Sequence, residues 1–286
     1  MANIRLIRRR IKSAKNITQI TKAMELVAAS KMKKAQAQAQ AGKLYAQKIY
    51  ETVMKLASQV DYKAHPLLRI PEKLTGKRLV VLISTNKGLC GSLNTNLFRF
   101  TLRELGDLKH YTFVTLGKKG ARFLAQMGAS ILADFSDTTP FVSHVGAVND
   151  LVTREFLSGN FDGVDILYNE FISALKQSPQ KKAILPLTIE SGTRSDADHE
   201  AEYVIEPGIP EVFSALLPHY VENQMRDALL QAEASEHSAR MIAMRNATDN
   251  AKSLVYDLTL LYNKARQEKI TYEISDMVTA RLAVES

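Results

Sequence analysis

Residues 4–27 read IRLIRRRIKSAKNITQITKAMELV, and their pattern indicates the architecture of the whole chain. Its apolar residues recur in steps of three and four, which places them on one face of a helix. That face cannot stay in water alone, because an isolated helix gains most of its stability by packing its apolar side against a partner. The predicted stripe comprises Ile4, Ile7, Ile11, Ala14, Ile17, Ile20, Met24 and Val27.

Helix-breaking residues divide the chain into three segments. All eight prolines and twelve of the thirteen glycines lie between positions 59 and 218. Inside a helix, proline costs about 3 kcal/mol and glycine about 1 kcal/mol. We therefore predict an N-terminal helix in segment 1–58, a central domain in 59–218 and a C-terminal helix in 219–286. The stripe of the last helix comprises Met241, Met244, Thr248, Ala251, Leu254, Leu258, Leu261 and Ala265.

The two helices are too long for a compact domain to enclose. At 1.5 Å per residue they measure roughly 80 and 100 Å. Wound together as a coiled coil, they bury both apolar stripes. One helix enters the central segment by its end and the other leaves it by its beginning, so the coiled coil must be antiparallel.

The central segment alternates strand-like and helix-like pieces. Residues 78–84 form a continuous apolar run, which is typical of a strand buried on both faces. Such alternation predicts a Rossmann-like α/β domain with a mostly parallel sheet. The expected strands are 78–84, 111–116, 164–171 and 184–189, and the expected helices are 92–105, 118–127 and 145–157. A polar loop follows at 191–198, and Pro218 either begins or kinks the last helix.

The charge is concentrated at one end of the chain. Residues 1–58 hold 13 lysines and arginines against two acids, whereas the whole chain has a net charge of +8, so the remainder is slightly acidic. With 45% hydrophobic and 24% charged residues, the composition is that of a globular protein. We expect an intracellular protein, because neither a bilayer-length apolar run nor a secretory signal is visible.

Motifs for catalysis are mostly missing. The glycine loop at 85–92, TNKGLCGS, follows a strand but matches neither phosphate-binding pattern, so a tight turn is the favoured interpretation over a nucleotide site. Cys90 is the only cysteine and excludes an internal disulfide; an inert thiol is favoured over a nucleophile. Six histidines without metal-binding spacing indicate no metal site. We expect no catalytic residue and no cofactor.

The basic N-terminal helix admits three interpretations. It is a solvated face, a surface for an acidic protein partner, or a nucleic-acid contact through runs such as Arg8–Arg10. Its aromatic residues, Tyr45 and Tyr50, lie far from the basic cluster, so stacking on bases is not supported.

Several long blocks resemble one family along the whole chain. Residues 20–25 (ITKAME) and 27–32 (VAASKM) are similar to the N-terminal helix of the gamma subunits of bacterial rotary ATP synthases. The loop 87–91 (KGLCG) resembles the central signature of that family. Residues 239–244 (ARMIAM) and 261–267 (LYNKARQ) resemble its C-terminal helix. One departure stands near the end, where Ala280 and Arg281 replace the usual Gly-Ala.

The resemblance implies a non-catalytic rotor shaft. It implies one copy per complex, inside a ring of alpha and beta subunits, with the epsilon subunit and the membrane c-ring bound by the central domain. It also implies a peripheral location on the cytoplasmic side of the bacterial cell membrane. The residues that it places at beta-subunit contacts are Met24, Lys87, Cys90, Arg266 and Gln267.

Two hypotheses from other functional classes remain open at this point. The first is a basic coiled-coil adaptor for nucleic acid, which requires salt-sensitive binding to unrelated duplexes. The second is a nucleotide-using enzyme built on the central domain, which requires ATP turnover by the isolated chain.

Overall fold

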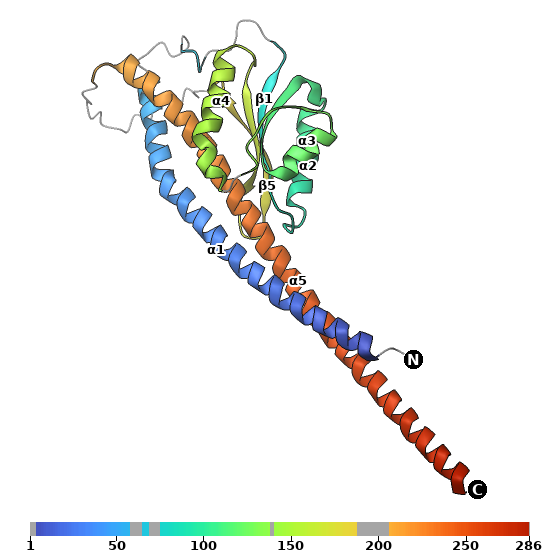
Figure 1. The fold of residues 1–286 in the computed structure, drawn as a ribbon. Helices are drawn as coiled ribbons and strands as arrows, with labels where there is room; N and C mark the ends of the chain where they lie inside the picture. Colours follow the sequence, from blue (N-terminus) through green and yellow to red (C-terminus); the bar gives the residue numbers. More distant parts are fainter. Residues whose placement is uncertain (1–3, 58–64, 69–74, 138–139, 188–205, 286) are drawn as a thin grey trace. The chain divides into compact units, whose positions relative to one another are not determined.

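The chain folds into two units, each of which takes in part of two long helices (Figure 1). The computed structural model describes residues 4–57, 65–68, 75–137, 140–187 and 206–285. Helix α1 spans Ile4–Ala57 and helix α5 spans Ile209–Glu285. The two-helix unit is Met1–Ala29 with Arg240–Ser286, and the α/β unit is Ser30–Ala239.

The α/β unit is built on one five-stranded sheet. Its strand order is β3-β2-β1-β4-β5, with β1 to β4 parallel and β5 antiparallel to β4. This arrangement confirms the predicted mostly parallel α/β architecture. The elements, in chain order, are β1 (Arg78–Ile83), α2 (Leu93–Leu105), the 3-10 helix η2 (Leu108–His110), β2 (Tyr111–Leu116), α3 (Lys118–Gln126), β3 (Ser130–Asp134), the 3-10 helix η3 (Phe141–His144), α4 (Val145–Leu157), β4 (Val164–Phe171) and β5 (Gln177–Leu185).

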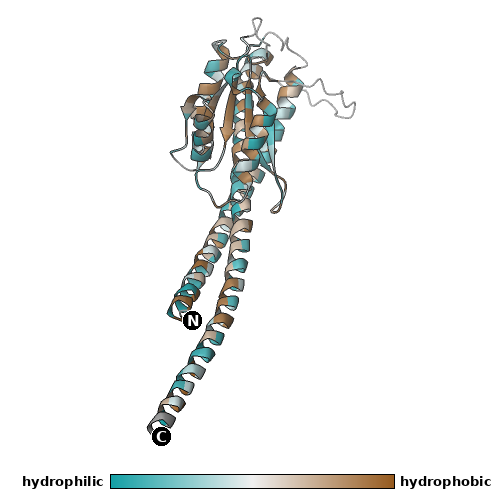
Figure 2. Cartoon of the chain, turned by 90° about the vertical axis from the view of Figure 1, so that its right-hand side faces the viewer, coloured by the Kyte–Doolittle hydropathy of each residue, from teal (hydrophilic) through white to brown (hydrophobic). Residues whose placement is uncertain are grey.

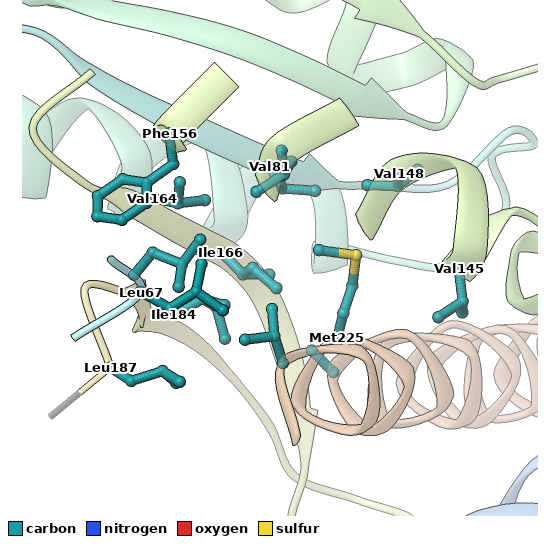
Figure 3. Close-up of a cluster of buried hydrophobic side chains, with 14 of the residues drawn as sticks. Leu67, Val81, Val145, Val148, Phe156, Val164, Ile166, Ile184, Leu187 and Met225 are labelled. Carbon is teal, nitrogen blue, oxygen red and sulfur yellow. The ribbon is translucent and has the colours of Figure 1, made fainter. Parts of the chain in front are cut away.

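Strand β1 is apolar on both faces because both faces of the sheet are covered. Val81 belongs to a cluster with residues of α1, α4, β4 and α5, and Met225 of α5 points into this cluster (Figure 3). On the opposite face, Val80 and Leu82 belong to a second cluster with α2 and α3. The continuous apolar run in the sequence is thus explained by two cores on either side of one strand.

The edges of the sheet differ from the prediction. Strand β3 is not predicted, because it is short and only partly buried along its length. The strand expected at 184–189 overlaps only the end of β5, which begins seven residues earlier; residues 188 and 189 lie outside the described ranges. The first residues of β5 are polar, so the sequence pattern did not predict them as part of a strand. An edge strand has one solvated side and also tolerates Pro179 there.

The last helix begins at Ile209, ten residues before the predicted boundary. Pro210 falls in the first turn, where proline lacks only a hydrogen bond that the helix does not need. Pro218 does not begin the helix but lies inside it. Its cost is offset by packing, because the neighbouring Phe213, Leu217 and Val221 are almost completely buried. The predicted polar loop at 191–198 lies outside the described residues.

The two-helix unit is an antiparallel coiled coil, as predicted. The described N-terminal part of α1 lies beside α5, and α5 runs in the opposite direction and continues past the start of α1 (Figures 1 and 2). Thr21 of α1 and Thr248 of α5 meet between the helices, with their hydroxyl oxygens 2.7 Å apart. In the described part of the chain, no helix combines the length and the apolarity that crossing a bilayer requires.

Candidate partner-binding surface

The contact between the helices of the two-helix unit follows a strict alternation of steps of three and four. We call this row of least exposed side chains the seam. In α1 it begins as the sequence predicts, with Ile4, Ile7, Ile11 and Ala14, and in α5 it begins with Met241 and Met244. The later seam residues are Thr18, Thr21, Glu25 and Ala28 of α1, and Thr248, Ala251, Val255, Leu258, Tyr262 and Ala265 of α5.

The predicted stripes are wrong in their later parts. Ile17, Ile20 and Val27 are 50%, 59% and 57% exposed, and Leu254 and Leu261 are 50% and 46% exposed. Each of them directly precedes a true seam residue. A helical stripe continues equally well by a step of three or of four. The sequence pattern predicted the isoleucines, valine and leucines, whereas in α1 the contact uses the smaller residues that follow them, Thr18, Thr21 and Ala28.

Small and polar residues can occupy the seam because their polar groups are satisfied locally. The Thr18 hydroxyl donates to the Ala14 carbonyl at 2.9 Å, and the Thr248 hydroxyl lies 2.8 Å from the Met244 carbonyl that accepts from it. Thr248 is only 2% exposed, and Ala28 likewise 2%.

The side chains displaced from the seam gather on one side of the coiled coil. In an antiparallel pair, equivalent flanking positions of the two helices lie on the same side of the coiled coil. The residues that directly precede seam positions in α1 therefore lie on the same side as those that directly precede seam positions in α5. We call this side the apolar flank. It holds six exposed large apolar residues: Leu6, Ile17, Ile20, Val27, Leu254 and Leu261. In Figure 2, hydrophobic and hydrophilic segments alternate along the outside of both helices.

The opposite flank is basic. Residues that directly follow seam positions include eight exposed lysines and arginines, which we call the basic flank: Arg5, Arg8, Lys12, Lys15, Lys22, Arg245, Lys252 and Arg266. Two of them form exposed ion pairs, Lys22 with Glu25 at 3.0 Å and Lys252 with Asp249 at 3.5 Å. Exposed pairs of this kind contribute little. The remaining excess of positive charge suits an acidic partner.

The end of α5 lies beyond the seam. From Arg266 to Arg281 every side chain is exposed. Five of these side chains are large and apolar: Ile270, Tyr272, Ile274, Met277 and Val278. A single helix in water is marginal without tertiary packing, so this end is suited to a surrounding protein surface.

The predicted contact residues fall in both units. Met24 is half-buried beside the seam, whereas Arg266 and Gln267 are exposed where the seam ends. Lys87 and Cys90 lie in the loop between β1 and α2, with Lys87 exposed and Cys90 only 3% exposed. The structure therefore brings together Arg266 with Gln267 in one unit, and Lys87 with Cys90 in the other.

Asn94 holds the loop between β1 and α2 in shape. Its side-chain amide donates to the Thr85 hydroxyl at 2.7 Å and to the Cys90 sulfur at 3.4 Å, while its oxygen accepts from the Thr85 backbone N–H at 3.3 Å. Leu89, at the top of the loop, is 62% exposed and has a positive φ of 62°. The loop thus presents an ordered apolar tip rather than a cradle for phosphate.

The start of α3 is the second place where a parallel α/β sheet could bind phosphate, but its backbone donors are taken. The N–H groups of Gly117, Lys118 and Lys119 donate to Ser136 Oγ at 3.0 Å, Asn86 Oδ1 at 2.8 Å and the Thr85 carbonyl at 3.1 Å. The Gly120 N–H donates to Ser84 Oγ at 2.7 Å. An anion at this helix end would have to displace all of these partners.

Gly117 is required for this close approach. Its φ is +110°, and a Cβ there would lie 2.3 Å from the Ser84 carbonyl oxygen. Only glycine fits such a position. The end of β1 and the start of α3 are thereby held against each other.

The crevice between β1 and β4 is filled by the chain itself. The strand order changes direction there, which is where open α/β sheets bind their ligands. Helix α5 places Ala232, Glu233 and Glu236 against the strand ends, and the space left is about 10 Å³, room for one water molecule. Glu233 Oε1 accepts a hydrogen bond from the Phe141 N–H at 3.1 Å, and burial raises the pKa of the Glu233 carboxyl.

The sequence pattern did not single out Glu233 or Thr21, and it placed Thr248 in the predicted stripe without indicating a partner for it. Glu233 lies about four turns into the predicted helix 219–286, which has the pattern of an ordinary amphipathic helix, and only the sheet packed against it gives it a role. Threonines at two seam positions were a usable signal, because polar residues inside a coiled-coil stripe are unfavourable unless they are paired. In the described ranges, no three His, Cys, Asp or Glu side chains gather as a metal site.

Comparison with known proteins identifies close relatives over the full chain. The family model described as ATP synthase matches residues 3–284. The ATP synthase gamma chain of Opitutus terrae is 44% identical, and the match covers 100% of both chains. That of Legionella pneumophila strain Corby is 37% identical over 99% of this chain and 100% of the relative.

Solved structures with a similar fold come from rotary assemblies. The central stalk and c-ring structure of the Tetrahymena thermophila mitochondrial ATP synthase contains a chain 25% identical, with a TM-score of 0.56, covering 80% of this chain and 99% of that one. A chain in the Euglena gracilis mitochondrial ATP synthase, solved as OSCP/F1/c-ring, gives a TM-score of 0.64 at 20% identity, covering 98% and 94%. This second likeness concerns the fold alone.

Proposed function

The chain belongs to the ATP synthase gamma-chain family, and on that premise we propose that it is the central rotor shaft of a proton-translocating ATP synthase. It couples rotation of the membrane c-ring to the conformational cycle of the catalytic beta subunits. It is a subunit of the complex and not the subunit that carries out catalysis. The nucleic-acid adaptor reading has no support from its relatives.

The observation that supports this function best is the two-sided surface of the two-helix unit. A shaft with an apolar flank on one side and a basic flank on the other presents different chemistry in different directions. Identical subunits around such a shaft meet different contacts at any one moment. Only differential contact can shift otherwise equal sites into different states, because a ligand that binds all states equally changes none of their populations.

The partners follow from the two units. We propose that alpha and beta subunits surround the two-helix unit, and that the exposed end of α5 is covered by their apolar surface. Met24, Arg266 and Gln267 contact beta subunits beside the seam and where it ends. Lys87 contacts a beta subunit directly, whereas the buried Cys90 supports the loop from within. Because the Cys90 side chain is buried, we place the beta-subunit contact on the exposed surface of this loop.

The remaining partners are proposed from the family. The central segment 59–218 binds the epsilon subunit and the c-ring, and segments 1–58 and 219–286 form the shaft. One copy is present in each complex, held on the cytoplasmic side of the bacterial cell membrane through its partners. Neither ATP nor a metal is needed by the chain itself.

Reconstitution with alpha and beta subunits tests the function. We expect the full chain to assemble with them and to support ATP hydrolysis, and with the membrane sector to support ATP-driven proton pumping. The variant Arg8→Glu/Lys15→Glu, which reverses two charges of the basic flank, should reduce pumping per assembled complex by an order of magnitude. Arg122→Glu, an exposed charge reversal on α3, is the matched control. Binding to unrelated nucleic-acid duplexes without affinity for alpha and beta subunits would overturn the proposal.

A further inference from the structure

Helix α5 is attached to the sheet by two kinds of contact. Its earlier part packs through apolar side chains, with Phe213, Leu217, Val221 and Met225 at most 1% exposed. Apolar burial opposes separation but is not directional, so it does not fix the rotational position of a helix as specifically as a hydrogen bond does. Further along, hydrogen bonds to the backbone of the sheet take over, and these are directional.

Three α5 side chains bind the end of β4 and the hairpin that follows it. The Ser235 hydroxyl donates to the Asn169 carbonyl at 2.9 Å, and the Ser238 hydroxyl donates to the Ala174 carbonyl at 2.6 Å. Gln231 Oε1 accepts from the Phe171 N–H at 3.4 Å. Both serines are completely buried. Their spacing of four and then three residues places all three side chains on one face of the helix.

Glu233 holds the other side of the same helix segment. Side chains two residues apart on a helix lie about 160° apart around its axis. Glu233 therefore lies on nearly the opposite side of α5 from Gln231. Its partner is the Phe141 N–H at the start of η3. Helix α5 is thus hydrogen-bonded from two sides, with the apolar core contact between them, and this arrangement opposes rotation about its own axis.

We propose that Gln231, Ser235 and Ser238, with Glu233 opposite, form a clamp that makes α5 turn together with the α/β unit. These are positioning residues: they touch no nucleotide, and they hold the helix in place against the sheet while it is under load. This inference rests on the proposed function, because a clamp against rotation matters only in a chain that transmits torque. Most of the partners on the sheet are backbone groups; in addition, the Gln177 side-chain amide of β5 donates to the Ser238 hydroxyl at 3.4 Å.

The test compares hydrolysis with pumping in the reconstituted complex. The double variant Ser235→Ala/Ser238→Ala removes both hydroxyls, and Ser214→Ala makes the same chemical change at an exposed α5 position. We expect the double variant to hydrolyse ATP within about two-fold of the wild-type rate when no gradient opposes it. Protons pumped per ATP should fall at least three-fold, with Ser214→Ala unchanged. Equal loss of hydrolysis and pumping, or no loss of either, would overturn the clamp.

A second pair of variants and a distance measurement separate the clamp from general loss of folding. Gln231→Glu keeps an acceptor for the Phe171 N–H and should retain pumping, whereas Gln231→Met should lose it. Spin labels at the exposed positions Leu175 and Arg226 report the distance from hairpin to helix in the full chain. The distribution should broaden in the serine double variant; an unchanged distribution counts against the clamp. If even the wild-type chain fails to couple, the proposed function fails and not the clamp alone.

Discussion

The two units place their apolar side chains in opposite ways. In the α/β unit the large residues are inside: Phe113, Phe213, Leu79 and Leu97 are essentially unexposed. In the two-helix unit the fully buried positions are mostly alanine and threonine, while isoleucines and leucines of both helices remain half exposed. The first unit completes its own core, whereas the second leaves large apolar side chains exposed. Sequence hydrophobicity alone does not separate the two cases.

The largest effect should come from shortening α5. Truncation after Leu254 removes four seam residues, Val255, Leu258, Tyr262 and Ala265, and exposes the start of α1. Each apolar side chain that loses its burial costs about 1.5 to 3 kcal/mol. We expect proton pumping in the reconstituted complex to be lost. Removal of 280–286 leaves the seam intact and should reduce pumping only modestly; equal, full pumping by both truncations would contradict a shaft role.

Next in size is overpacking of the seam. Ala28→Leu adds bulk at a position 2% exposed, and such a change typically costs about 1 to 3 kcal/mol. We expect the isolated full chain to unfold at a lower temperature. Ile20→Ser, on the apolar flank, should change its stability by less than about 0.5 kcal/mol and yet weaken assembly with alpha and beta subunits. If instead Ile20→Ser lowered the stability of the isolated chain and Ala28→Leu did not, the seam would follow the apolar stripe predicted from the sequence.

A smaller effect is expected for the threonine pair between the helices. Thr21→Val and Thr248→Val each remove one hydroxyl of the 2.7 Å contact. A double-mutant cycle on urea unfolding should give a coupling of about 0.5 to 1.5 kcal/mol, the usual net contribution of one hydrogen bond. Strictly additive effects of the two variants would show that the hydroxyls do not interact in solution.

The smallest effect concerns the pH dependence contributed by Glu233. Because burial raises its pKa in the folded chain above the ordinary value of 4.5, the folded state holds the proton more tightly than the unfolded state. This contribution to stability is complete below the ordinary carboxyl range and is lost as pH rises through the raised pKa. Glu233→Gln cannot ionise, so its stability relative to wild type should increase from about pH 4.5 upward and then level off. Urea unfolding from acidic to neutral pH measures this difference, and a constant difference at every pH would rule it out.

Much of the fold was accessible from local patterns. The long helices followed from the placement of proline and glycine, and the buried strand β1 followed from its continuous apolar run. Strand β3 and the start of β5 were missed because edge strands are short, partly solvated and polar. Among the candidate contacts, Met24, Lys87, Cys90, Arg266 and Gln267 came from family resemblance and remain predictions, and the structure adds their exposure: Cys90 is buried, and Lys87, Arg266 and Gln267 face solvent.

Periodicity and local backbone preferences were enough to predict that the two long helices pair and that the segment between them forms a mostly parallel sheet. The face of each helix that enters the seam became known only from the packing of the two helices against each other. Stripes that begin at Ala14 and continue to Ile17 or to Thr18 are equally helical, and the choice depends on how closely the partner helix can approach. The same holds for Glu233 and Ser235, whose roles come from backbone groups of the sheet distant in sequence, which no local pattern contains.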